Sequence, residues 1–90
     1  MDDILHTIGL ALVNSLTPVA GGRWVLSALY DGSWAVQLIT SYKQLFIQFI
    51  LREDGLIAYF GTQRILIDYN EPTLFDDLER RVVNITATLR

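Results

Sequence analysis

The chain has 90 residues, of which 51% are hydrophobic and 19% are charged, and its formal net charge at pH 7 is −3. This length predicts one domain, residues 1–90, with a single core, and the high apolar content excludes intrinsic disorder. With no Cys and one His, the chain cannot hold disulfides or cysteine-based metal and haem sites, and we expect no catalytic residues, metal or cofactor. The acidic balance argues against nucleic acid as a partner.

The N-terminal segment is poor in charge, yet it does not predict a membrane or export segment. Residues 4–22 contain no formally charged side chain. A signal peptide begins with positive charge, whereas this chain begins Met1-Asp2-Asp3. Polar residues such as His6 and Asn14 interrupt the apolar run that a membrane-spanning helix needs. We therefore expect a cytoplasmic protein that does not bind a membrane.

An amphipathic helix is predicted from about Asp3 to Leu16. Ile4, Ile8 and Leu12 recur at helical spacing, and Pro18 stops the helix. From Trp24 onward the hydrophobic period changes from 3.6 to 2, which is typical of strands. The expected strands are Trp24–Tyr30, Ser33–Tyr42, Leu45–Arg52, Leu56–Phe60 and Arg64–Tyr69.

Two pairs of residues predict tight hairpins between these strands. Asp31-Gly32 and Asp54-Gly55 are typical of two-residue type I′ turns, because both central positions of that turn need positive φ. A closing helix is expected from about Thr73 to Leu89, preceded by Pro72. The fold class is therefore α+β: a single two-layer domain in which a five-stranded antiparallel meander is flanked by N- and C-terminal helices, in the order α-β-β-β-β-β-α.

The turn positions divide the sheet into two faces. If the Asp31-Gly32 register holds, Val25, Ser27 and Leu29 share a face with Trp34, Val36 and Leu38, and we assign that face to the core. The later strands are expected to add Leu45, Ile47, Phe49, Leu51, Ala58, Phe60, Ile65, Ile67 and Tyr69 to it.

The opposite face is also apolar, and we interpret it as the partner-binding surface. Its principal residues are predicted to be Trp24, Leu26, Tyr30, Phe46, Ile50 and Tyr59. Such a patch exceeds what a monomer normally exposes, so something covers it. Either one helix crosses to this side and makes a three-layer domain, or a protein partner covers it, most economically a second copy in a two-fold homodimer.

The leading hypothesis is a small, non-enzymatic protein–protein interaction module, such as an adaptor, a chaperone-like subunit or an inhibitor. The alternative is a small-ligand-binding carrier or sensor domain with an aromatic-lined pocket. The residues that would wall that pocket are Trp24, Tyr30, Trp34, Tyr42 and Tyr59. An enzyme ranks third, because His6 is the only side chain that titrates near neutral pH and no nucleophile motif accompanies it.

Overall fold

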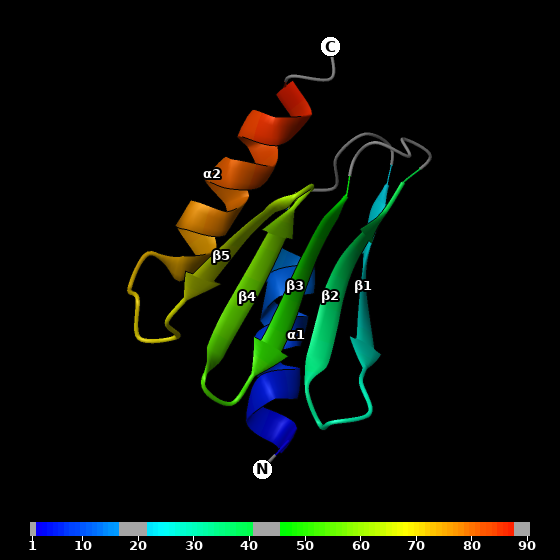
Figure 1. The fold of residues 1–90 in the computed structure, drawn as a ribbon, viewed down its shortest axis with the longest axis vertical. Coiled ribbons are helices and arrows are strands. Elements are labelled where there is room, and N and C mark those ends of the chain that lie inside the picture. The colour runs from blue at the N-terminus through cyan, green and yellow to red at the C-terminus, as the bar shows by residue number, and fades with distance from the viewer. Residues whose placement is uncertain (1, 17–21, 41–45, 88–90) are drawn as a thin grey trace.

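The computed structural model describes residues 2–16, 22–40 and 46–87, and its helices and strands follow the predicted order (Figure 1). The elements are α1 (Asp2–Ser15), β1 (Arg23–Ala28), β2 (Trp34–Ile39), β3 (Ile47–Arg52), β4 (Gly55–Phe60), β5 (Gln63–Ile67) and α2 (Leu74–Ala87). The five strands form one antiparallel sheet in sequence order. The predicted α+β meander between two terminal helices is confirmed.

Both helices pack against the same face of the sheet, and in Figure 1 α1 lies behind the strands while α2 lies alongside β5. Leu12 of α1 and Leu78 of α2 belong to one buried cluster with the sheet residue Phe49. α1 approaches β1 closely at Gly9, which has no side chain. A Cβ placed on this residue would lie 2.6 Å from Leu26 Cδ1. The domain therefore has two layers, and the alternative in which a helix crosses to the other face is wrong.

Phe49, in the central strand, organises the aromatic part of the core. It is fully buried, and its ring stacks on Trp24 with the centroids 5.7 Å apart. Phe60 meets the same ring edge-on at 5.8 Å. Such offset and edge-to-face pairs add to the stabilisation that burial of aromatic area provides.

The first hairpin differs from its predicted register by one residue. Gly32 has the expected positive φ of 85°, but its N–H donates to the Leu29 carbonyl, and Leu29 N–H donates to the Ser33 carbonyl. This is a three-residue loop, Tyr30-Asp31-Gly32, ending in a left-handed glycine, and not a two-residue turn. The extra loop residue changes which residue of β1 stands opposite each residue of β2.

The register shift reverses the two faces of β1. Trp24 pairs with Leu38 and Leu26 pairs with Val36, so both residues lie on the core side. Val25 and Ser27, which were predicted to face the core, lie on the opposite side, because a one-residue slip inverts every side chain of a strand. Leu29, between β1 and the loop, is exposed, and Leu45 lies outside the described residues.

The second hairpin keeps its predicted faces although its turn is also displaced. Arg52 pairs with Gly55, so the loop residues are Glu53 and Asp54, and Gly55 begins β4 with a φ of 153°. A two-residue Asp54-Gly55 turn would have paired Glu53 with Leu56, so the register between β3 and β4 differs from the predicted one by two residues. An even shift leaves the faces unchanged, and Ile47, Phe49, Leu51, Ala58 and Phe60 are buried as expected.

Leu78→Ala is expected to lower the free energy of unfolding by about 2–5 kcal/mol, because truncating this fully buried side chain leaves a cavity in the core. Val83→Ala, on the exposed side of the same helix, is the control. It should be neutral or slightly stabilising, since Ala is the better helix former. Denaturant titration measures both variants, and a cost below about 1 kcal/mol for Leu78→Ala would contradict the assigned core.

Candidate functional site

The face of the sheet opposite the helices, the outer face, is the side nearest the viewer in Figure 1. Neither helix of the described chain covers it. Strand alternation places on it Val25, Ser27, Ala35, Gln37, Ile39, Gln48, Ile50, Arg52, Ile57, Tyr59, Arg64 and Leu66.

An apolar row crosses the middle of the outer face from strand to strand. The paired residues are Ala35, Ile50, Ile57 and Leu66, one each from β2 to β5. Ala35 and Ile57 are buried although no second layer covers them, because neighbouring side chains on the same face shield them. Leu66 ends the row on the edge strand and is 69% exposed. The row is therefore apolar from β2 to β5, but it is exposed to solvent mainly at Leu66 and in part at Ile50.

A mixed row runs beside the apolar one. It contains Val25, Gln37, Gln48, Tyr59 and Arg64 in register. Beyond this row, towards the ends of β2 and β3, Ile39 and Phe46 are 44% and 41% exposed. The outer face is thus apolar at its centre and at one end, with amide groups between.

Half of the six predicted partner-binding residues belong to this surface. Ile50 and Tyr59 lie on the outer face, and alternation places Phe46 at its end. Trp24 and Leu26 lie on the core face instead. Tyr30 is fully exposed in the β1–β2 loop.

The surface also includes residues that the site prediction omitted. Leu66 and Ile39 are its most exposed apolar side chains. Both alternate in phase with Ile50 and Tyr59, so strand periodicity contained the signal for them.

The charges on the strands are all positive and all lie on the outer face. Arg23, Arg52 and Arg64 come from β1, β3 and β5. Asp68 follows β5 in the same alternation and, together with Arg64, lines a hollow of about 490 Å³ at that edge. The face therefore combines apolar contact area with charges of both signs near its border.

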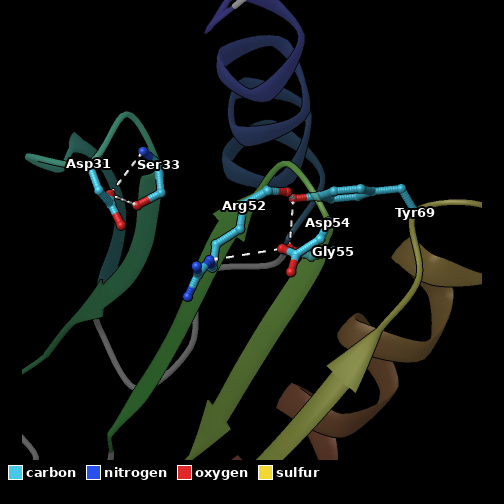
Figure 2. A network of polar contacts seen from close by, with 6 residues as sticks. All are labelled: Asp31, Ser33, Arg52, Asp54, Gly55 and Tyr69. Atoms are coloured by element: carbon cyan, nitrogen blue, oxygen red, sulfur yellow. Dashed lines mark hydrogen bonds and ion pairs between the residues drawn. The ribbon is translucent and has the colours of Figure 1, made fainter.

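A second hollow, also of about 490 Å³, lies where the β1–β2 loop and the β3–β4 turn approach α1. Its lining is Leu5, Asp31, Gly32, Ser33, Arg52, Glu53 and Asp54. Figure 2 shows Asp31 turned towards Ser33, and Arg52 turned towards Asp54 at 3.9 Å. The Arg52–Asp54 pair is solvated and contributes little to stability. Within the described residues, no three His, Cys, Asp or Glu side chains gather to hold a metal ion.

Tyr69 ties the chain after β5 to the β3–β4 turn (Figure 2). Its hydroxyl donates to the carbonyl oxygens of Arg52 at 2.7 Å and Gly55 at 3.2 Å. Partial burial raises the pKa of Tyr69 to about 12, and the nearby Asp54 carboxylate acts in the same direction. This contact holds the loop end of the outer face in position.

The aromatic residues proposed to wall a ligand pocket are dispersed. Trp24 is stacked in the core, whereas Trp34 packs against the His6 ring at 4.7 Å. Tyr30 lies in a loop, Tyr59 lies on the outer face and Tyr42 lies outside the described residues. Neither of the two hollows is lined by any of them.

Comparison with known proteins gives no relative from which a function could be inferred. No family model matches the chain, and no curated protein or solved structure is significantly similar to it. Among the described residues, neither helix is long and apolar enough to cross a membrane.

Tyr69→Phe is expected to reduce the free energy of unfolding by about 1 kcal/mol, because two carbonyl oxygens lose a hydroxyl donor. The raised pKa means that the neutral hydroxyl stabilises the fold fully below pH 10, and that this contribution is lost as the pH rises towards 12. Denaturant titration and phenolate absorbance measure these effects. Tyr30→Phe, at a fully exposed position, is the control and should leave stability unchanged.

Ser33→Ala is expected to raise the pKa of Asp31 towards its ordinary value. The Ser33 hydroxyl and the Ser33 N–H both donate to the Asp31 carboxylate. These hydrogen bonds lower the pKa of Asp31, and the bond from the hydroxyl has the larger effect. At a pH above its ordinary pKa, the ionised Asp31 carboxylate therefore stabilises the loop fully. This stabilisation is lost as the pH falls through the lowered pKa of the folded state. NMR titration of the Asp31 carboxyl carbon tests this, with Ser27→Ala as the control that should not move it.

Proposed function

We propose that the chain is a small, non-enzymatic protein-interaction module that self-associates through the outer face. The observation that carries the proposal is that Leu66, Ile39 and Phe46 are exposed apolar side chains on one face of the sheet. Leu66 ends the row that begins at Ala35, and Ile39 and Phe46 lie beyond the amide groups of the mixed row. Both helices pack on the other face, so the monomer has no further layer within the described residues to cover this one.

The dimensions of the sheet agree with a weak, specific contact. Five strands about 4.8 Å apart, rising about 3.3 Å per residue, present a face roughly 20 Å on each side. Two such faces, with the relief of their side chains, bury on the order of 1,000 Å² in total. That area is at the lower limit of specific interfaces, so we expect a concentration-dependent, transient dimer.

A second copy is the most economical partner, because the face offers a self-complementary mixture of groups. An interface between identical copies needs apolar groups at the centre and charges of both signs towards the border. The outer face has Ile50 and Ile57 at its centre, with Arg64 and Asp68 at one edge. The core of the monomer does not depend on the contact, since Phe49 and its neighbours are already buried.

Leu66→Lys is expected to weaken dimerisation at least about tenfold, because it places a charge in the apolar row without touching the core. Sedimentation equilibrium over a series of micromolar concentrations gives the dissociation constant, and circular dichroism should remain unchanged. Ile4→Lys is the matched control, since Ile4 is 66% exposed on α1, in the other layer. A wild-type chain that stays monomeric throughout, or equal effects of the two variants, would contradict the proposal.

A further inference from the structure

The two ends of the outer face differ in shape. Tyr59 lies on one side of the central apolar row and Gly55 lies on the other, both on β4. Gly55, without a side chain, lines the hollow of about 490 Å³ together with Ile57, Leu66 and Asp68, and Arg52 and Arg64 also border it. Aromatic bulk therefore lies on one side of the row, and on the other side β4 has a residue without a side chain.

The charges on β5 and just after it follow the same division. Arg64 and Asp68 lie on opposite sides of Leu66, two residues away in each direction. Four residues of extended chain separate them by about 13 Å, too far for an ion pair within one copy. The Asn70 N–H donates to Asp68 Oδ1 at 2.9 Å and holds the carboxylate in place. A carboxylate has two oxygens, so Asp68 can also accept from a guanidinium.

A two-fold axis that lies in the plane between two sheets brings one outer face against another, and its two limiting directions are parallel to the strands and across them. An axis parallel to the strands places β5 over the partner's β1, so that Arg64 approaches the end of β1 that carries Arg23. An axis across the strands places each strand over the same strand of the partner, and the two strands then run in opposite directions. Only the second arrangement brings unlike charges together and sets the aromatic bulk against the residue without a side chain.

Resting on the proposed function, we propose that the two-fold axis runs along the apolar row, so that Arg64 of each copy pairs with the partner's Asp68. In this arrangement Ile50, Ile57 and Leu66 pack against the same residues of the partner, because they lie on the axis. Tyr59 then lies over the partner's Gly55, where the hollow accepts its ring. The sheets pack face to face, about 10 Å apart, with the angle that their twist imposes.

The geometry predicts a charge-reversal pattern that other arrangements do not produce. Arg64→Glu alone places a second carboxylate beside Asp68 in both contacts of the dimer, and Asp68→Lys alone places two positive charges together. Each variant should dimerise at least about tenfold more weakly than the wild type, because two attractive pairs become repulsive. A mixture of the two variants should restore association, since the heterodimer has two attractive pairs.

The experiment is sedimentation equilibrium of each variant, of their equimolar mixture and of the double variant Arg64→Glu/Asp68→Lys. The mixture and the double variant should both return to within about threefold of the wild-type dissociation constant. Glu53→Lys makes the same charge change as Asp68→Lys but lies in the β3–β4 loop, away from the partner's Arg64. The double variant Arg64→Glu/Glu53→Lys should therefore stay as weakly associated as Arg64→Glu alone, because its carboxylate at position 64 still faces the partner's Asp68.

The outcomes separate this arrangement from the proposed function. If Leu66→Lys dissociates the dimer but the charge-reversed variants fail to rescue each other, the outer face is the interface and the proposed axis is wrong. If the wild-type chain is monomeric, or if Leu66→Lys has no more effect than Ile4→Lys, both proposals fail. Unchanged circular dichroism of Arg64→Glu and Asp68→Lys confirms that any loss of association is not a loss of fold.

Discussion

The packing of both helices against one face of the sheet is the constraint on which the rest of the molecule depends. α1 and α2 come from opposite ends of the chain, yet Leu12 and Leu78 enter the same buried cluster around Phe49. A sheet has two faces, and the described part of the chain has two helices of 14 residues each that could cover them. Because both are used on one face, the apolar row on the other side is left at the surface.

The fold was predictable from the sequence because several independent signals agreed. The hydrophobic period changes from 3.6 to 2 near Trp24, glycines follow acidic residues at two turns, and amphipathic patterns occur at both ends. These signals determine which elements form and in what order. They do not fix the number of residues in a loop, which hydrogen bonds such as that from Gly32 N–H to the Leu29 carbonyl determine.

The accuracy of the site prediction therefore depended on the parity of each loop. The β3–β4 turn was displaced by an even amount, so Ile50 and Tyr59 remained on the predicted face. The β1–β2 loop was displaced by an odd amount, so Trp24 and Leu26 exchanged faces with Val25 and Ser27. The Asp31 side chain, which accepts two hydrogen bonds from Ser33, stabilises a loop that the Asp-Gly pair alone does not distinguish from a tighter turn.

The distribution of charge limits where association can occur. Arg23, Arg52 and Arg64 lie on the outer face, whereas Glu53, Asp54 and Glu71 lie in the β3–β4 loop and the segment before α2. α2 itself carries three acidic residues and two basic ones, Asp76, Asp77, Glu79, Arg80 and Arg81. Copies approaching through these acidic regions repel each other, as expected for a chain with a net charge of −3. The outer face carries exposed apolar side chains and charges of both signs, Arg64 and Asp68 at one edge, so two copies can meet there with unlike charges together. A monomer whose core is already complete can then associate weakly through one face and remain folded when it separates.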